Sequence, residues 1–440
     1  MTRLSGWGRY PVADCTLTRP RGEDAVRDAL GAGPVIARGN GRAYGDAALQ
    51  PRGTIDMRRM SRMLDFDPDT GRVEVEAGVL LGDVIRAFLP RGWFPAVTPG
   101  TKLVTIGGCI ASDVHGKNHR GDGSFARHLD WIDLMGADGE VTRCTRQSNG
   151  DLFDWTPGAM GLTGVVLRAG FRLRPVESGW IAQETIPAAN LKEAMAVLEG
   201  ATSTYSVAWF DCLGRGDDLG RSLVMLGDHA AQADLPSDKR YRPFHVPPKR
   251  RKRVPVDAPA MALNRYTLRA FNSLYHWAGA RKSGHALVDW DTYFYPLDAV
   301  LDWNRIYGRR GFAQYQCVIP LAAADAGLTR LLDTISASGQ GSFLAVLKRL
   351  GPQGGPFSFP MEGYTLALDF PVNDRTLALL NDLDAITLDH GGRLYLTKDS
   401  RASAATIRAM DDRAATFRAM REARGLTGAF ASGQSERLNL

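Results

Sequence analysis

Alternating and periodic apolar positions predict short strands and one helix in the first 175 residues. Residues 72–77 alternate strictly between polar and apolar side chains, which is typical of a half-buried strand. Residues 80–90 carry a helical pattern that stops before Gly92. The segments 128–135 and 140–144 flank a glycine-containing turn and predict a hairpin, and a long strand is expected from 163 to 175.

The second half of the chain has a different order of elements. Its pattern predicts a strand at 312–319, a helix at 321–338, strands at 342–348 and 363–370, a helix at 373–390 and a strand at 393–397. This β-α-β-β-α-β order is typical of a ferredoxin-like unit. A last helix at about 401–423 precedes a C-terminal tail that we expect to return to the first domain.

Composition places the chain among globular proteins of two or three domains. It has 440 residues, of which 44% are hydrophobic and 23% charged. The net charge of +6 fits anionic ligands or a membrane surface and does not by itself predict nucleic-acid binding. The five scattered cysteines predict reduced thiols. Without a signal peptide or a long apolar run, we expect a protein that is cytoplasmic or peripheral to a membrane.

One polar segment, 228–260, is rich in proline and strongly basic at Pro-Pro-Lys-Arg-Arg-Lys-Arg (247–253). Three interpretations of this segment remain. It is a solvated mobile loop, a patch that meets anionic lipid headgroups, or a nucleic-acid or nuclear signal.

Two glycine-rich segments carry candidate chemistry. The first, 37–46, has three glycines after a strand-like stretch and can aim backbone N–H groups at a phosphate, although it matches neither the dinucleotide fingerprint nor a Walker A loop. The second, 99–119, puts small residues at 105–108, where a flat or anionic group can lie on the backbone. His115 and His119 have a zinc-like spacing, but no third ligand is evident and we expect no metal.

A third segment, 394–401, is a strand followed by a helix. Asp399 or Ser400 is a plausible helix N-cap, which is the purely structural interpretation. Lys398 is the candidate for chemistry, because a buried lysine with a lowered pKa can orient or deprotonate a hydroxyl group.

Together the motifs point to a family. Arg-Gly-x-Gly-Arg-x-Tyr-Gly-Asp at 38–46, Val-Thr-Ile-Gly-Gly at 104–108 and Gly-Leu-Thr-Gly-Val-Val at 161–166 occur in order. This set resembles the FAD-binding domain of the vanillyl-alcohol-oxidase (PCMH-type) family. Nearly the whole chain is similar to that family's oxidases of polyprenylphosphoryl ribose, through stretches at 39–42, 113–119, 208–211, 314–316, 342–344, 348, 398–401 and 430–432.

The resemblance implies an α+β fold of two domains. Residues 1–178 would bind FAD, residues 179–392 would form an antiparallel-sheet substrate domain, and residues 393–440 would return to the FAD-binding domain. The implied FAD-binding residues are Ile36, Ala37, Arg38, Gly39, Asn40, Gly41, Arg42, Ala43, Tyr44, Gly45, Asp46, Gly100, Thr105, Ile106, Gly107, Gly108, Ser112, Asp113, Val114, His115, Val166 and Tyr395.

The resemblance also implies how FAD is held. Many relatives carry a histidine in the Gly-rich loop that bonds covalently to the flavin, and here Arg42 takes that place. We therefore expect dissociable FAD, with His115 as a rival attachment point.

The implied reaction oxidises the 2′-hydroxyl of a lipid-linked ribose. Lys398 is the first candidate for the base, Tyr44 the second, and His115 completes the catalytic set. The implied substrate-binding residues are Lys117, Trp209, Gln314, Gln316, Lys348, Thr365, Ala367, Asp369 and Lys398. Thr365 and Ala367 stand where members of the group have Asn and Cys, so this wall of the pocket is smaller and lacks a thiol.

The implied partners are a polyprenyl-phosphate-linked pentose, an NAD(P)H-dependent short-chain keto-reductase that completes an epimerisation, and a membrane surface met through 249–253. Two alternatives remain. One is an oxidase of soluble sugars, alditols or aldonolactones, and the other is a non-enzymatic lipid- or nucleic-acid-binding protein built on a flavin fold.

Overall fold

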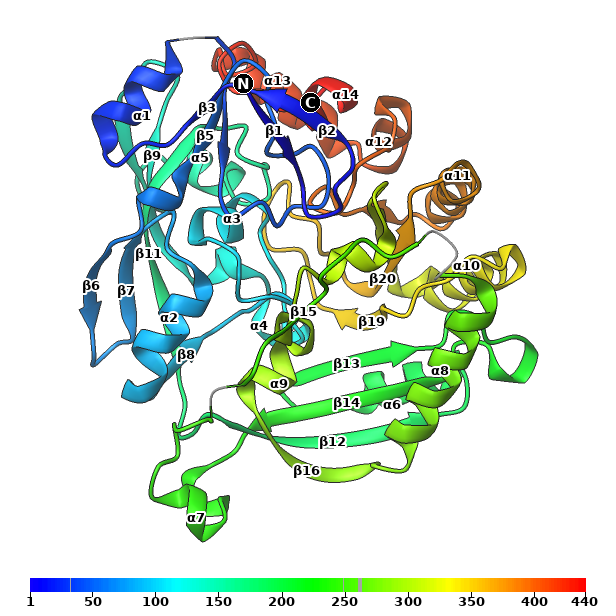
Figure 1. Ribbon diagram of the computed structural model, residues 1–440. Coiled ribbons are helices and arrows are strands. Elements are labelled where there is room, and N and C mark those ends of the chain that lie inside the picture. Colours follow the sequence, from blue (N-terminus) through cyan, green and yellow to red (C-terminus); the bar gives the residue numbers. More distant parts are fainter. Residues whose placement is uncertain (32, 248, 260–262) are drawn as a thin grey trace.

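The computed structural model describes residues 1–31, 33–247, 249–259 and 263–440. Its first part contains a six-stranded antiparallel sheet in the order β10-β9-β11-β7-β6, with β8 paired to β11, and a smaller parallel sheet in the order β3-β5-β4 (Figure 1). The strands are β1 (Thr2–Ser5), β2 (Val12–Cys15), β3 (Leu17–Thr18), β4 (Ile36–Arg38), β5 (Thr54–Asp56), β6 (Met63–Asp67), β7 (Arg72–Glu76), β8 (Trp93–Pro95), β9 (Leu129–Met135), β10 (Val141–Cys144) and β11 (Val165–Pro175).

Short helices connect these strands, and the local predictions for this part are confirmed. The helices are α1 (Glu23–Leu30), α2 (Leu81–Phe88), α3 (Ile106–Ala111), α4 (His119–Asp122) and α5 (Gly150–Trp155). In β7, Val73 and Val75 are fully buried, as the alternation predicted. Helix α2 runs on through a 3₁₀ turn, Leu89–Arg91, and stops at Gly92, whose φ of +83° suits the left-handed cap of a helix.

An eight-stranded antiparallel sheet, in the order β16-β12-β14-β13-β19-β20-β18-β21, forms the second part. Its strands are β12 (Trp180–Ala188), β13 (Tyr205–Phe210), β14 (Ser222–His229), β16 (Gly284–Asp289), β18 (Phe312–Pro320), β19 (Ala345–Leu350), β20 (Gly363–Pro371) and β21 (Arg393–Leu394). The last four have the ferredoxin-like strand order, which confirms the predicted unit. The first four repeat that order, and the sequence pattern did not reveal this.

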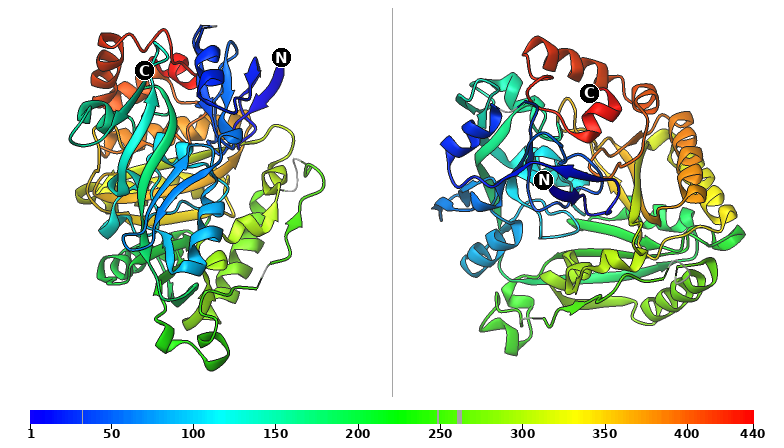
Figure 2. Two further views of the ribbon diagram at one scale, coloured as in Figure 1. Left: turned by 90° about the vertical axis from the view of Figure 1, so that its left-hand side faces the viewer. Right: turned by 45° about the horizontal axis from the view of Figure 1, so that its top comes forward.

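The two faces of this sheet are covered differently. Helices α6 (Leu191–Gly200), α10 (Ala324–Ser338) and α11 (Asp374–Asp389) pack on one face over the main apolar core. Helix α8 (Arg265–Ala280) lies on the opposite face, against β12 and β14, as does α9 (Trp290–Phe294) (Figures 1 and 2). Along β14, Val224 belongs to the core under α6, whereas its neighbour Leu223 touches Gly279 of α8.

Three predicted element bounds were wrong. The strand at 342–348 begins only at Ala345, because Ser342 Oγ bonds the backbone of Leu344 and holds a turn there. The strand at 393–397 is two residues long, because the chain turns where Lys398 N–H donates to Tyr395 O. The predicted helix at 401–423 is two helices, α12 (Ala404–Met410) and α13 (Arg413–Ala423), separated by extended backbone at Asp411.

The C-terminal residues contact the first sheets. Phe430 pairs with Val35 in a parallel bridge, and Gly433 N–H donates to Leu49 O at 2.8 Å. Helices α12, α13 and α14 (Gly433–Leu438) lie at the same end of the molecule as β1 and β2 (Figures 1 and 2).

The basic segment is partly ordered by contacts. It contains α7 (Ser237–Arg240) and β15 (Lys252–Arg253), which pairs in parallel with β17 (Val300–Leu301). Lys249 bonds Asp289 at 2.7 Å, while residues 250–253 are exposed. Pro248 and Ala260 of this segment lie outside the described residues.

Candidate active site

The Gly-rich loop 39–46 follows β4 and is clamped at its far end by the C-terminal segment. Tyr44 N–H donates to Thr397 O at 2.9 Å. A Cβ on Gly45 would overlap Asp399 O, so only glycine allows this approach. Asp46 accepts a hydrogen bond from Arg437 at 2.7 Å. Asp46 therefore anchors the loop rather than facing a ligand.

The loop packs directly on the second glycine-rich segment. A Cβ on Gly39 would overlap Thr105 Oγ1, and Asn40 Nδ2 donates to Leu103 O at 2.8 Å. Thr105 caps the N-terminus of α3, where its Oγ1 accepts from Gly108 N–H at 3.2 Å. Two motifs far apart in sequence thus form one continuous backbone surface.

The two motifs differ in the backbone N–H groups that they can offer to a ligand. In the described part of the chain, the N–H groups of residues 40–43 donate to no protein acceptor. Those of Ile106 and Gly107 already donate to Val79 O and Ala77 O. The first loop therefore has free donors of the kind that phosphate groups need, and the second contributes a close approach without side chains.

Arg42 lies at the centre of this surface. Its guanidinium stacks over the Trp7 ring at 3.9 Å, and its buried Nε has no partner among the described residues. Burial lowers the pKa of Arg42, and the nearby Asp298 carboxyl opposes that shift. A buried guanidinium with an unpaired donor fits an anionic or carbonyl-bearing group such as that of FAD.

The next segment is fixed by hydrogen bonds. Asp113 is fully buried with a φ of +38°, and its carboxyl group accepts from Ser124 Oγ, Ser358 Oγ and the Ala126 N–H. Burial raises the pKa of Asp113. Tyr395 Oη donates to Ser112 O at 2.8 Å. These bonds hold the 112–115 backbone against the start of the C-terminal segment.

His115 is buried and has a free ring nitrogen. Gln316 Nε2 donates to its Nε2 at 3.2 Å, while Nδ1 has no partner among the described residues. The ring lies 5.2 Å from that of Tyr395. Burial, with the charge of Lys348 next, moves the pKa of His115 well below its ordinary value. The imidazole is therefore neutral at physiological pH.

Three half-buried lysines surround this histidine. Burial lowers the pKa of Lys117 to about 7 and that of Lys348 to about 8. Burial also lowers the pKa of Lys398, and the charge of Lys348 adds to the shift. Lys117 Nζ donates to Tyr293 O and lies 4.0 Å from the centre of that ring. The site is thus rich in amines that are close to losing their protons.

Lys398 belongs to a cluster with three polar partners. Its Nζ lies 3.9 Å from the centre of the Tyr44 ring. Gln314 Nε2 donates to Asp369 Oδ1 at 2.5 Å and to Tyr44 Oη at 3.3 Å. Burial raises the pKa of Asp369, whose Oδ2 has no hydrogen bond within the described chain. Burial raises the pKa of Asp369 to about 7 and lowers that of Lys398 to about 7, and the attraction between the two opposite charges opposes both shifts.

The strands bring the remaining substrate candidates to the same face. Gln314 and Gln316 alternate along β18, as predicted, and Gln316 Nε2 also donates to Thr365 Oγ1 at 3.2 Å. Ala367 lies opposite Gln316 in the register of β18 and β20. Trp209 on β13 is buried, and its Nε1 donates to Phe343 O at 3.0 Å.

Two of the FAD candidates have no polar side-chain contact among the described residues, and five neighbours of the site were missed. Val166 is a core residue of the first sheets, and Gly100 is exposed with open space around it. No motif marks the missed residues, which come from separate segments that only the folded chain brings together. They are Trp7, Tyr293, Asp298, Ser358 and Phe359.

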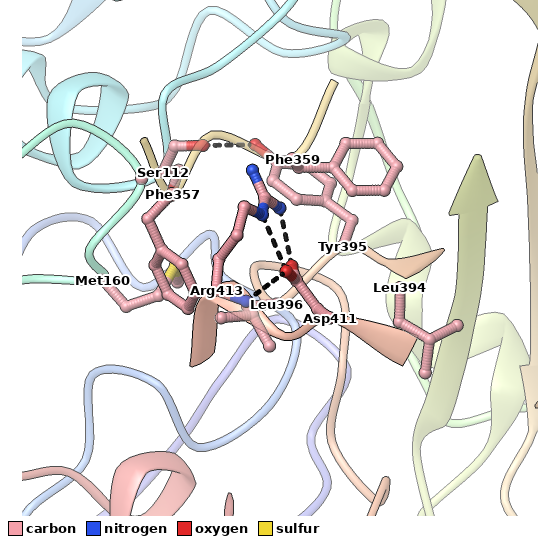
Figure 3. Close-up of a pocket in the computed structure, with 10 residues that line it drawn as sticks. Ser112, Met160, Phe357, Phe359, Leu394, Tyr395, Leu396, Asp411 and Arg413 are labelled. Atoms are coloured by element: carbon pink, nitrogen blue, oxygen red, sulfur yellow. Dashed lines mark hydrogen bonds and ion pairs between the residues drawn. The ribbon is translucent and has the colours of Figure 1, made fainter. Parts of the chain in front are cut away.

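Tyr395 lines two hollows. One, of about 300 Å³, is lined by Ser112, Met160, Phe359 and the ion-paired Asp411 and Arg413 (Figure 3). The other, of about 230 Å³, is lined by Gln314, Gln316 and Ser400, among others. Both reach residues of the candidate site from the side of the C-terminal segment.

Outside residues 32, 248 and 260–262, no three His, Cys, Asp or Glu side chains are grouped as a metal ion requires. Within the same residues, no helix has the length and apolar character needed to cross a bilayer.

Comparisons with known proteins show the family and the fold of this chain. Residues 18–145 match the family model described as an FAD binding domain. The whole chain is 37% identical to a protein of Mycolicibacterium smegmatis named decaprenylphosphoryl-beta-D-ribose oxidase, of which it covers 97%. It is 30% identical over 39% of both chains to L-gulonolactone oxidase of Mus musculus. A solved structure of Physcomitrella patens BBE-like 1 superposes with a TM-score of 0.62 at 15% identity, covering 89% of this chain and 87% of that one, which shows a shared fold.

Proposed function

Because this chain belongs to the vanillyl-alcohol-oxidase family of FAD-binding oxidoreductases, we propose that it oxidises the 2′-hydroxyl of a polyprenylphosphoryl-β-D-ribose to the 2′-keto sugar. The substrate class is transferred from the relative that is 37% identical along the whole chain. The observation that carries the proposal is the cluster of Tyr44, Gln314, Asp369 and Lys398 beside the Gly-rich loop. The non-enzymatic alternative is wrong, since the chain is an FAD-dependent oxidoreductase.

We assign the binding of FAD to the backbone surface of residues 36–46 and 105–108, with 112–115, Gly100, Val166 and Tyr395 around it. Held there, FAD would supply the acceptor for the hydride that leaves the 2′-carbon. The free N–H groups of 40–43 and the unpaired Arg42 Nε suit its anionic and carbonyl groups. Because Arg42 replaces the histidine that links the flavin in many relatives, we propose that FAD is dissociable.

Lys398 is the proposed base. Its lowered pKa leaves a neutral amine that accepts the hydroxyl proton while the carbon–hydrogen bond breaks. Tyr44 Oη, which accepts from Gln314, is placed to orient the same hydroxyl. Burial moves the pKa of Tyr44 well above its ordinary value, so the phenol stays protonated and donates. His115 completes the set as a neutral ring beside Gln316.

The remaining polar residues suit a sugar linked to a phosphodiester. We assign Lys117 and Lys348 to the phosphate and the sugar hydroxyls, because a bound anion stabilises their ammonium forms. Gln316, Thr365 and Asp369 present a hydrogen-bonding wall, and Trp209 and Ala367 bound the pocket.

The proposed product needs a second enzyme if the reaction is to end in an epimer. A 2′-keto sugar becomes an epimer only when a second enzyme reduces it, and we propose an NAD(P)H-dependent short-chain keto-reductase. The lipid-linked substrate also requires contact with a membrane, for which we propose 249–253. Within this segment Lys249 is held by Asp289 and Arg253 by Asp302, so Arg250, Arg251 and Lys252 are the freest cations.

The test is anaerobic addition of a polyprenylphosphoryl ribose to the FAD-loaded protein. Loss of the oxidised flavin absorbance supports the proposal, and an unchanged spectrum contradicts it. A polyprenylphosphoryl sugar that lacks the 2′-hydroxyl is the matched control and leaves the flavin oxidised.

A second candidate function is oxidation of a soluble sugar, alditol or aldonolactone. It is favoured by the smaller wall at Thr365 and Ala367 and by the partial similarity to L-gulonolactone oxidase. Rapid peroxide formation with a panel of soluble sugars and lactones would support it, and silence across the panel would contradict it.

A further inference from the structure

Helix α8 packs on the sheet, but most of its large apolar side chains lie on the face that points away from the sheet. The stripe that faces the sheet holds Leu268, Asn272 and Gly279, and Asn272 Nδ2 bonds Asp211 at 2.8 Å. The outward face carries large apolar side chains. The most exposed of them are Tyr266 at 73%, Leu274 at 61% and Trp277 at 55%. Such a concentration on one helix marks an interaction surface.

The charged residues of this segment have one sign. Between Asp257 and Asp289 the sequence has four Lys or Arg residues and no Asp or Glu. They are Arg265, Arg269, Arg281 and Lys282. Arg265 and Arg281 lie over the rings of Tyr266 and Trp277, at 5.5 and 4.6 Å. Cations that flank aromatic side chains on a helix surface are typical of helices that lie in the headgroup region of an anionic bilayer.

The same face continues into the candidate active site through touching aromatic rings. Tyr275 lies 4.6 Å from Trp209, and Phe271 lies 5.9 Å from Phe343. Phe343 stacks on Tyr307, which stacks on Phe312, which meets the Tyr44 ring. An apolar path therefore joins the outward face of α8 to the residues around Lys398. A ligand with a sugar at one end and a long hydrocarbon at the other matches both ends of this path.

We propose that the outward face of α8 is the surface by which this protein docks on an anionic lipid bilayer, with Leu274 and Trp277 in the acyl boundary and the four flanking cations at the headgroups. This inference rests on the proposed function, since it gives the lipid-linked substrate a route from the bilayer to the site. It differs from the proposed contact through 249–253, which is electrostatic alone.

The experiment is sedimentation of the FAD-loaded full-length protein with vesicles of phosphatidylcholine, with and without phosphatidylglycerol. Binding to the anionic vesicles that weakens with salt is expected for the native chain. The double substitution Leu274→Ser with Trp277→Ser should weaken it by about tenfold or more, because both exposed side chains lose their apolar area. The matched control is Leu64→Ser with Leu388→Ser, at two side chains of 42% and 39% exposure on β6 and α11, and should bind as the native chain does.

A second pair of variants isolates the charges. Arg269→Gln with Arg281→Gln should weaken binding to anionic vesicles by about tenfold or more and leave the residual binding less sensitive to salt. Native-like binding by both double variants would overturn the proposal, as would an equal loss in the Leu64 and Leu388 control.

The proposed function is tested by a separate measurement. Flavin reduction by a short-chain, water-soluble polyprenylphosphoryl ribose should be the same in the α8 variants and the native chain. If the native chain does not reduce its flavin with this probe, the proposed function fails, whereas the vesicle result still decides the docking surface.

Discussion

Replacing Lys398 with Met tests the proposed chemistry most directly. Methionine keeps an unbranched apolar side chain that reaches as far as Cε of the lysine, and it lacks the amine, which lies 3.9 Å from the centre of the Tyr44 ring. The neighbouring backbone bond, Lys398 N–H to Tyr395 O, does not depend on the side chain. We therefore expect a folded variant that retains FAD.

The size of the effect follows from the role of the amine. A positioned general base contributes about 10² to 10⁴ in rate, which corresponds to about 3 to 5 kcal/mol of the barrier. Anaerobic stopped-flow measurement of flavin reduction at saturating substrate reports this step without the reoxidation. Reduction by Lys398→Met at a rate within about threefold of the native rate would refute the assignment of the base.

The pH dependence of flavin reduction tests whether Lys398 acts as a neutral amine. The base acts only when it is neutral, so the rate should rise with pH as the pair of Lys398 and Asp369 loses a proton. Because burial lowers the pKa of Lys398, this limb should lie near neutral pH rather than near 10.5. The positive charge of Lys348 contributes to the shift, so Lys348→Met should move the limb to higher pH and leave the high-pH rate of flavin reduction largely unchanged. A limb that moves to lower pH would contradict this electrostatic account.

Three further predictions follow from the loop, the cofactor and a buried histidine. Gly39→Ala should lower the free energy of unfolding by about 1–3 kcal/mol and lower FAD retention after desalting, because the new Cβ overlaps Thr105 Oγ1. The matched control is Gly428→Ala, which should change neither property because a Cβ there meets open space. Acid precipitation should release the yellow colour to the supernatant, and colour that stays in the pellet would contradict dissociable FAD. Burial lowers the pKa of His119 from 6.5 to about 4. The stability that the neutral ring contributes above pH 6.5 should therefore be lost as the pH falls toward 4, by up to about 3 kcal/mol. In urea unfolding across that range, His119→Asn should show a smaller loss of stability than the native chain.

Local patterning predicted what depends on neighbours in sequence. Strand β7 and helix α2 follow from their own periodicity, and Gly92 stops the helix by its backbone freedom. The ferredoxin-like order of the first four strands of the large sheet was missed because a long polar segment separates β14 from α8 and β16. The break near Asp411 was missed because it depends on the ion pair with Arg413, which the helical pattern does not register.

The site residues also divide into those that the sequence could predict and those that it could not. The glycine motifs and Lys398 could be found because their residue types are unusual at those places in the chain. Partners such as Tyr293 under Lys117, or Trp7 under Arg42, could not, because they are ordinary aromatic residues brought there by distant elements. Asp113 carries a hydrogen-bonding role that tertiary contacts alone define.

The electrostatics of the site lead to a last prediction, on proton uptake. Lys117 and Lys348 have pKa values of about 7 and about 8, lowered by burial, so at pH 8 the first is mostly neutral and the second is half protonated. A bound phosphodiester would stabilise both ammonium forms and raise both pKa values, and the complex should therefore take up about one proton at this pH. Calorimetry of substrate-analogue binding in buffers of different ionisation enthalpy measures this number directly. The double variant Lys117→Met with Lys348→Met should bind more weakly and take up almost none, and a binding heat that does not depend on the buffer in the native chain would show that the lysines do not meet the phosphate.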